Sequence, residues 1–336
     1  IFASFLPART HAVSRMAVYT QVPDQDLARF VEGHGLGELR SCKGIAEGVE
    51  NTNYMLQTTT GRYILTLYEK RVEAKDLPFY LGLMEHLAGK GIACPLPVRD
   101  AKGEQIGELA GRPAAVCTFL DGISVRQPDV GNCALLGEML ARMHIAGLDY
   151  PLRRANALGA TGWRPLYARF SARADRVQPG LAALIEAELD NLLPHWPMGL
   201  PQGIIHADLF PDNVFFLGGR LSGVIDFYFA CNDALAYDVA ICLNAWCFGA
   251  RGGYDRDKGQ ALLEGYQRMR KLNEDEQAAL PALARGAALR FLLTRSYDWL
   301  ETPADAIVKP HNPDDYVQRI LCHRAMVTAA AYGLDR

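Results

Sequence analysis

The stretch Gly203-Ile-Ile-His-Ala-Asp-Leu-Phe-Pro-Asp-Asn-Val-Phe-Phe-Leu217 decides the fold, and a Gly-rich turn leads from it to Leu221-Ser-Gly-Val-Ile-Asp-Phe227. Apolar runs, which are typical of short buried strands, flank a polar cluster, and Asp226 stands at the end of the last run. Asp208 can accept a hydroxyl proton, whereas Asn213 and Asp226 offer the oxygen ligands that Mg²⁺ prefers. The segment therefore predicts a site that transfers a phosphoryl group with the help of a metal ion.

The spacing within this segment strengthens that prediction. Four residues separate Asp208 from Asn213, and Asp226 follows Asn213 by thirteen positions. Protein kinases have their catalytic loop, metal-binding Asn and metal-binding Asp in this order. Phe227 extends the match, although Tyr228 stands where a protein kinase has Gly. The pattern indicates a small-molecule kinase of related fold.

Turn formation is the competing explanation for the same residues. Pro211-Asp212 suits a type I turn, Gly218-Gly219 suits a hairpin, and turns recruit Asp and Asn for their own sake. Either carboxylate alone would be more typical of a turn than of a catalyst. Their joint occurrence with Asn213 between apolar strands favours the catalytic explanation.

Composition and charge predict a globular protein whose partners are small molecules. Of the 336 residues, 49% are hydrophobic and 22% charged, and the formal net charge is -3. Such a chain can bury a large core and is long enough for two lobes. The near balance of 35 basic and 38 acidic residues gives no reason to expect a nucleic acid or a membrane surface as partner.

The eight cysteines predict buried thiols in a reducing cytoplasm. They contain no Cys-x-x-Cys pair, and several lie within apolar runs. A disulfide-linked secreted protein is the alternative. The apolar runs are interrupted by charges well before about 18 residues, so we expect no transmembrane helix.

The order of apolar periodicities predicts an α+β protein with two lobes. Residues 1–16 are expected to be an extension outside the fold, residues 17–120 a nucleotide-binding lobe with a small antiparallel sheet, and residues 121–336 a mainly helical lobe with the catalytic loop and the substrate pocket. Strands are expected at 41–48, 53–58, 62–68, 106–109 and 112–120, and a single strand pair at 203–227. Helices are expected at 23–33, 77–90, 130–146, 179–193, 235–246, 258–271, 274–299 and 313–332.

The segment Gly44–Tyr54 stands where such a fold needs a loop over the nucleotide phosphates. Gly48 permits close backbone approach, and Asn51 and Asn53 follow it, so we expect these three residues to bind ATP. An ordinary hairpin is the competing explanation, because Gly and Asn are common in turns.

Several motifs carry a resemblance to a known family. His206-Ala-Asp-Leu-Phe-Pro-Asp-Asn213 and Ile225-Asp-Phe227 resemble motifs of the aminoglycoside-phosphotransferase-like kinases. Within that superfamily, Leu209-Phe-Pro211 and Tyr228-Phe-Ala-Cys231 resemble the bacterial homoserine kinases of threonine biosynthesis. The resemblance extends over essentially Met16–Arg336. Its other stretches are Glu47–Tyr54, Arg62–Glu69, Leu77–Leu81, Gly111–Ala115 and Leu243–Phe248.

The resemblance implies a two-lobed protein-kinase-like fold that phosphorylates the hydroxyl of L-homoserine with ATP. Asp208 would then be the base for this hydroxyl, Asn213 and Asp226 would hold Mg²⁺ on the phosphates, and His206 would brace the loop. By the same resemblance, adenine would contact the backbone of residues 117–120, which include Phe119 and Leu120.

Homoserine is a small zwitterion, so its pocket should pair the carboxylate with Arg or backbone donors and the ammonium with an acid or carbonyl oxygens. The candidate substrate contacts are Tyr228, Asn244, Trp246, Arg290 and Arg295. For the two arginines an exposed helix face is the competing explanation. We expect Asp238 to cap its helix or to brace the catalytic loop, and His144 to be a core histidine.

The chain departs from the family at one pair of positions. Relatives usually carry a Lys or Arg on the strand after the phosphate loop, paired with a Glu on the next helix, whereas this chain has Thr66 and, approximately, Tyr80. Loss of only one of these charges would leave the other without its partner, whereas the loss of both does not. The candidates for neutralising the phosphates instead are Lys43, Lys70 and Arg71.

Two other functions compete with the homoserine kinase prediction. The first is a kinase of the same fold that acts on choline, an aminoglycoside, methylthioribose or another small alcohol. The second is a catalytically silent binding protein, which the missing Lys and Glu suggest and which the intact Asp208, Asn213 and Asp226 oppose. Either a monomer or a homodimer is compatible with the sequence.

Overall fold

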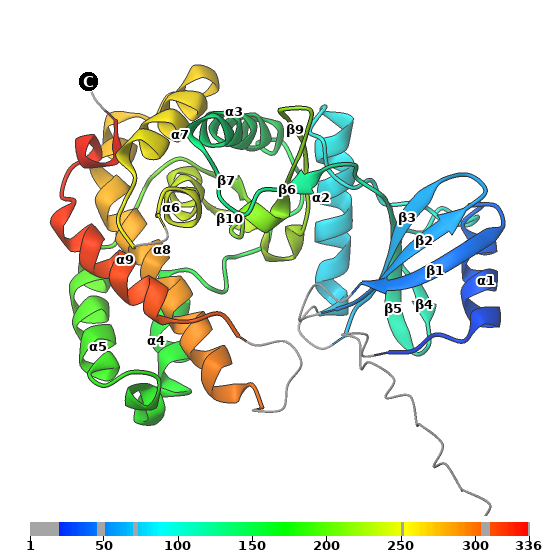
Figure 1. The fold of residues 1–336 in the computed structure, drawn as a ribbon, viewed down its shortest axis with the longest axis horizontal. Coiled ribbons are helices and arrows are strands. Elements are labelled where there is room, and N and C mark those ends of the chain that lie inside the picture. Colours follow the sequence, from blue (N-terminus) through cyan, green and yellow to red (C-terminus); the bar gives the residue numbers. More distant parts are fainter. Residues whose placement is uncertain (1–19, 46–50, 70–72, 250–251, 304–309, 335–336) are drawn as a thin grey trace, which may run out of the picture. The chain divides into compact units, whose positions relative to one another are not determined.

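The structure, a computed structural model, describes residues 20–45, 51–69, 73–249, 252–303 and 310–334 (Figure 1). Its contacts divide the chain into two compact units. One comprises the described residues of Ile1–Arg71 and Arg99–Val116, and the other those of Val72–Val98, Cys117–Ala304 and Lys309–Arg336. Residues 72–98, which we expected in the first lobe, group with the helical unit. The extension at 1–16, Gly48, Lys70 and Arg71 lie outside the described residues.

The smaller unit is built on a five-stranded sheet in the order β1-β2-β3-β5-β4. Neighbouring strands pair antiparallel in β1–β2, β2–β3 and β4–β5. The strands are β1 (Leu39–Ile45), β2 (Thr52–Thr58), β3 (Arg62–Leu67), β4 (Gly107–Leu109) and β5 (Arg112–Thr118). Helix α1 (Asp24–Gly33) packs on β4, where a Cβ on Gly107 would lie 2.8 Å from the Phe30 ring. The five strands predicted from the sequence are confirmed.

The larger unit is helical and is organised around the buried helix α6 (Leu235–Trp246). Helix α6 contacts α8 (Glu274–Glu301), which in turn contacts α9 (Asp314–Ala325) (Figure 1). A Cβ on Gly137 would lie 2.0 Å from the Leu262 carbonyl, so only glycine lets α3 (Val130–Ala146) and α7 (Arg256–Met269) approach this closely. The other helices of the unit are α2 (Leu77–Gly89), α4 (Ala160–Ala168) and α5 (Leu181–Leu192).

Two small sheets position the decisive segment within the helical unit. Strand β7 (Gln202–Ile205) pairs antiparallel with β10 (Cys231–Ala234). Strand β8 (Val214–Leu217) pairs with β6 (Ile123–Ser124) and with β9 (Arg220–Val224). The catalytic segment thus leaves one sheet at Ile205 and enters the other at Val214.

The structure corrects the predicted elements in several places. The expectation of a single strand pair at 203–227 is wrong, because β10 and β6 add partners from outside that segment. Helix α4 was not predicted, because Gly162 and Pro165 weaken its helical propensity. The helix expected at 313–332 ends at Ala325, and a 3₁₀ turn at Ala329–Tyr332 follows it.

The cysteines and the hydropathy largely follow expectation. All eight thiols are free, and six of them are buried; Cys42 is exposed and Cys322 partly exposed, contrary to the prediction. In the described part of the chain, no helix combines the length and the apolar character that crossing a membrane requires.

Candidate active site

The catalytic loop runs from His206 to Asn213 and is anchored by Asp238 of helix α6. The Asp238 carboxylate accepts hydrogen bonds from the backbone N–H groups of His206 at 2.7 Å and of Ala207 at 2.9 Å. Ala207 has a φ of 63°, a left-handed conformation that costs a non-glycine residue on the order of 1–2 kcal/mol. The two hydrogen bonds therefore hold a strained turn directly before Asp208. Asp238 does not cap its helix, so of its two predicted roles only the bracing role is confirmed.

His206 connects the loop to the end of strand β9. Its Nε2 donates to the Ile225 carbonyl at 2.9 Å, and its Nδ1 accepts from the Asp208 N–H at 3.3 Å, an assignment that follows from these partners. Burial lowers the pKa of His206, and the nearby Asp238 only partly opposes this shift. A neutral ring with both nitrogens occupied favours the bracing role that we expected for His206.

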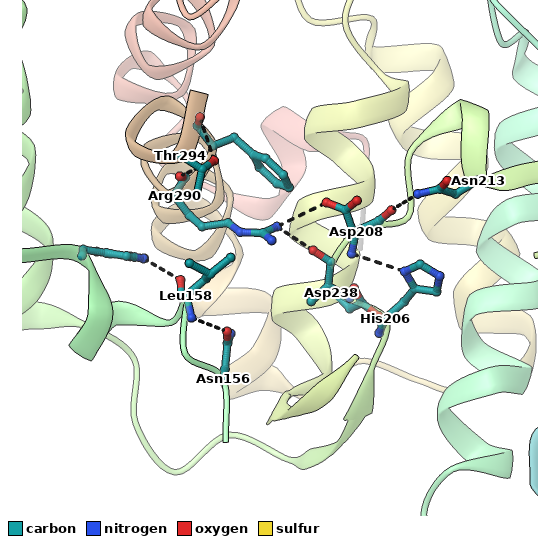
Figure 2. Close-up of polar contacts among 11 residues, drawn as sticks. Asn156, Leu158, His206, Asp208, Asn213, Asp238, Arg290 and Thr294 are labelled. Atoms are coloured by element: carbon teal, nitrogen blue, oxygen red, sulfur yellow. Dashed lines mark hydrogen bonds and ion pairs between the residues drawn. The ribbon is translucent and has the colours of Figure 1, made fainter. Parts of the chain in front are cut away.

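The Asp208 carboxylate faces a buried guanidinium, as Figure 2 shows. Arg290 Nη1 lies 3.8 Å from Asp208 Oδ1 and donates to the Ala207 carbonyl at 2.5 Å. The Arg290 side chain is only 4% exposed and stacks on Phe291, with its Cζ 4.0 Å from the ring centroid. The competing explanation of an exposed helix face is therefore wrong for Arg290. Its contacts make it a positioning residue for the loop, and its predicted contact with the substrate stays a prediction.

A backbone hydrogen bond links Asn213 to Ile225, the residue before Asp226, where β8 and β9 meet the loop. The Asn213 side-chain amide donates to the Asp208 carbonyl at 2.8 Å (Figure 2). The Asn213 carbonyl accepts from the Ile225 N–H at 3.0 Å. Since the Nδ2 atom is bound to the loop, Oδ1 is the end that can coordinate a cation. Asp226, at a φ of 65°, follows directly after this contact.

These two residues fit a magnesium site of the kind that keeps other ligands. Mg²⁺ is commonly held by one or two protein oxygens, with phosphates and water completing its octahedron. Within the described ranges, no group of three or more His, Cys, Asp or Glu side chains forms a metal cage. The oxygen donors of Asn213 and Asp226 therefore suit a metal that arrives with a nucleotide.

Two predicted substrate residues have internal partners. Asn244 is buried, and its amide donates to the carbonyls of Ala240 and Ala284 and accepts from His323. Trp246 is 1% exposed, and its indole N–H donates to the Leu209 carbonyl at 2.8 Å. These contacts favour a supporting role for both residues, and their contact with substrate is untested.

Tyr228 and Arg295 make aromatic contacts. Tyr228 belongs to the 3₁₀ turn after Asp226, and its ring meets that of Tyr80 edge to face, with centroids 5.7 Å apart. Arg295 is on α8 with its side chain 15% exposed, and it stacks on Phe210 of the catalytic loop. Both keep their place among the candidate substrate contacts.

His144 is a core histidine, as predicted. It is fully buried; its Nε2 lies 3.1 Å from Asp238 Oδ2, and its Nδ1 lies 2.8 Å from the Tyr266 hydroxyl. The sequence offered no signal for this pairing, since the two partners are 94 residues apart.

Of the two positions of the missing ion pair, Thr66 lies in the smaller unit and has a neutral partner, whereas Tyr80 lies in the helical unit with the Arg154 guanidinium over its ring. The Thr66 hydroxyl donates to Asn53 Oδ1 at 2.8 Å, and Asn51 Oδ1 accepts from the Glu69 N–H at 3.4 Å. Sequence reasoning missed Glu69, whose carboxylate is 9% exposed and pairs with Arg112 at 3.2 Å.

Lys43, a candidate for neutralising the phosphates, is exposed on β1. Of the predicted adenine contacts, Phe119 and Leu120 directly follow β5.

His323 provides a test of pH-dependent stability in the helical unit. Burial, with Arg319 and Arg285, lowers its pKa to about 3, so the folded state keeps the ring neutral. An unfolded histidine takes up its proton near pH 6.5, and stability therefore falls as pH drops from about 6.5 towards 3, by about 1.4 kcal/mol per pH unit. We expect His323→Gln to reduce this slope by about that amount.

The measurement is urea unfolding followed by tryptophan fluorescence at several pH values between 7 and 4. All four tryptophans lie in the helical unit, so the signal reports on that unit alone. The slope is informative even when His323→Gln lowers the stability at every pH. An unchanged slope in the variant would show that His323 does not titrate differently on folding.

Comparisons with known proteins agree with this geometry. Residues 41–272 match the sequence model of the phosphotransferase enzyme family. A homoserine kinase of Sinorhizobium fredii is 60% identical over 321 residues, which cover 96% of this chain and 98% of the relative. A homoserine kinase of Xanthobacter autotrophicus is 58% identical over 319 residues, which cover 95% of this chain and 99% of the relative.

A solved structure supports the fold independently. The amicoumacin kinase solved in complex with AMP-PNP and Ca²⁺ matches with a TM-score of 0.65 at 16% identity, covering 90% of this chain and 92% of that one. At this identity the likeness concerns the fold alone, and it confirms the predicted two-lobed kinase-like architecture. The chain therefore belongs to the phosphotransferase enzyme family, and within it to the family of the homoserine kinases.

Proposed function

We propose that this chain transfers the γ-phosphoryl group of ATP to the hydroxyl of L-homoserine and releases ADP and O-phospho-L-homoserine, a step of threonine biosynthesis in the cytoplasm. The observation that carries the proposal is the 60% identity to a homoserine kinase over 96% of the chain. The chemistry of the catalytic loop supports it, because the loop holds the Asp208 carboxylate and the candidate metal ligand Asn213, whose carbonyl is hydrogen-bonded to the residue before Asp226. The partners of such a reaction are small molecules.

Asp208 would orient the substrate hydroxyl and accept its proton as the phosphoryl group is transferred. Its position is held from three directions, by Arg290, by Asn213 and by the anchored backbone at His206. Positioning and charge neutralisation account for most of the catalysis in such transfers, so a rigid loop matters more than a strong base. When bound, Mg²⁺ on Asn213 and Asp226 would neutralise charge on the phosphates.

For the nucleotide we propose Gly48, Asn51 and Asn53 in the smaller unit, with Phe119 and Leu120 for adenine. Thr66 and Tyr80 supply no charge where relatives have Lys and Glu. The metal ion would then have a larger share in stabilising the transferred group than it has in relatives that keep the pair.

A coupled assay of ADP release tests the proposal. With ATP and Mg²⁺ we expect turnover of L-homoserine, little turnover of serine, and none of choline or kanamycin. Chelation of Mg²⁺ by excess EDTA should abolish the activity, and restored Mg²⁺ should recover it. Equal rates with choline and homoserine would contradict the proposed substrate, and activity that survives EDTA would contradict the metal site.

A further inference from the structure

Three guanidinium groups gather near the ring of Tyr316, and one of them, that of Arg290, faces Asp208. Arg295 and Arg319 both stack on this ring, with their Cζ atoms 4.6 Å and 4.4 Å from its centroid. Arg290 stacks on Phe291, which itself stacks on Tyr316 with centroids 5.3 Å apart. Helices α8 and α9 thus bring the three cations to one place.

The cations of this cluster are poorly neutralised. Among the described residues, Arg290 and Arg295 pair with the carboxylates of Asp208 and Asp315, and each pair is 3.8 Å apart, which is long for an ion pair. For Arg319 no ion pair is found among the described residues. Burial lowers the pKa of Arg295, and the charge of Arg319 adds to this shift. The cluster therefore has an excess of positive charge in a partly desolvated place.

Two polar atoms of the cluster are buried without a hydrogen-bond partner in the described part of the chain. They are the Tyr316 hydroxyl and Nη1 of Arg319. Tyr316 is fully buried. Burial raises the pKa of Tyr316, and the charges of Arg319, Arg295 and Arg290 oppose that rise. Native proteins rarely bury such donors unpaired, because each one has lost its water without gaining a partner. Stacking on aromatic rings explains why guanidinium groups lie here, but it satisfies neither donor.

The anion that this cluster binds could belong to ATP or to the second substrate, and the side of the loop on which the cluster lies distinguishes the two. In Figure 2, Arg290 approaches Asp208 from one side and Asn213 contacts the loop on the other. In the proposed function, the metal and the nucleotide phosphates would lie on the side of Asn213. An anion on the side of Arg290 is therefore better explained by the second substrate than by ATP.

We propose that Arg319, Arg295 and the Tyr316 hydroxyl bind the α-carboxylate of the substrate while its hydroxyl lies at Asp208, an inference that rests on the proposed homoserine kinase function. Guanidinium groups bind carboxylates through paired N–H donors, and the tyrosine hydroxyl adds a third donor. This contact would select amino acids over amino alcohols of the same length.

The first test is Arg319→Met, which keeps the length of the side chain and removes its charge. We expect the KM for L-homoserine to rise about 10- to 100-fold, since a hydrogen bond to a charged group has about this effect on binding. The inhibition constant of 3-aminopropan-1-ol, which is homoserine without its carboxylate, should stay within about twofold of wild type, and so should the KM for ATP. Arg268→Met, at an exposed position of α7, is the matched control and should leave all three constants unchanged.

The outcomes separate this inference from the proposed function. A wild-type enzyme with no activity on L-homoserine contradicts the proposed function itself. A wild-type enzyme with that activity, combined with equal losses for L-homoserine and 3-aminopropan-1-ol in Arg319→Met, assigns Arg319 a structural role and overturns the inference. A rise in the KM for ATP alone assigns the cluster to the nucleotide and also overturns it.

Tyr316→Phe is a second variant that keeps the shape of the core. Because the hydroxyl is unpaired in the free protein, its removal should leave the melting temperature unchanged or raise it, while the KM for L-homoserine rises about 10-fold. A lower melting temperature with an unchanged KM would show that the hydroxyl has a structural partner and would overturn its role in binding.

Discussion

Replacing Asp208 by Asn should reduce kcat by a factor of about 10² to 10⁴, while the affinity for ATP changes little. The variant keeps the shape of the side chain but removes the acceptor that we assign to the substrate hydroxyl. The loop has anchors that do not depend on this carboxylate: Asp238 holds the backbone at 206–207, and Asn213 binds the Asp208 carbonyl. The loss should therefore be chemical and not conformational.

Steady-state kinetics with saturating L-homoserine and a separate measurement of nucleotide binding distinguish these two kinds of loss. Asp212→Asn is the matched control, because Asp212 is an exposed acid of the same loop for which the structure indicates no catalytic contact. It should retain near-native turnover. Near-native turnover in Asp208→Asn would instead remove the base from the mechanism, and a large loss of ATP binding would show that the loop had changed shape.

The parts of this site that the sequence predicted are those that are local in the chain. Asp208, Asn213 and Asp226 lie within one short segment whose apolar flanks form strands, so spacing alone could predict that they act together. Helices α3 and α6 were predicted to the residue for the same reason, because an uninterrupted helical periodicity is visible in a single window of sequence.

The parts that the sequence could not predict depend on distant partners. An arginine within helix α8 has the pattern of a surface charge, whereas Arg290 is buried against partners that include the Ala207 carbonyl, 83 residues away, and Asp208. Tyr316 and Arg319 were missed because α9 comes to Arg295 and Phe291 only through its tertiary packing on α8. Strand β10 was missed because its four residues, Cys-Asn-Asp-Ala, have no alternating pattern, and its pairing with β7 defines it.

Asp238→Ala should lower the stability of the helical unit by about 3–5 kcal/mol, which is typical when one partner of a buried charged network is removed. Three donors depend on this carboxylate: the N–H groups of His206 and Ala207, and His144 Nε2. Burial alone would raise the pKa of Asp238, but His144 and His206 outweigh that effect and lower it. The ionised carboxylate therefore contributes its full stabilisation above about pH 4 and loses it as pH falls further.

Urea unfolding at pH 7, monitored by tryptophan fluorescence, measures the predicted loss of stability. The control is Asp257→Asn, at an exposed position, which should change the stability by less than about 0.5 kcal/mol. The loss of stability in Asp238→Asn should lie between those of Asp238→Ala and Asp257→Asn, because an amide keeps one acceptor oxygen but places its own N–H donors against other N–H donors.

Both Asp238 variants should also lose turnover where they remain folded, since the strained turn at Ala207 would no longer be held. A stable, inactive Asp238→Ala protein would mean that the carboxylate orients the loop without supporting the fold, and a stable, active one would show that Arg290 and Asn213 suffice to hold Asp208 in place.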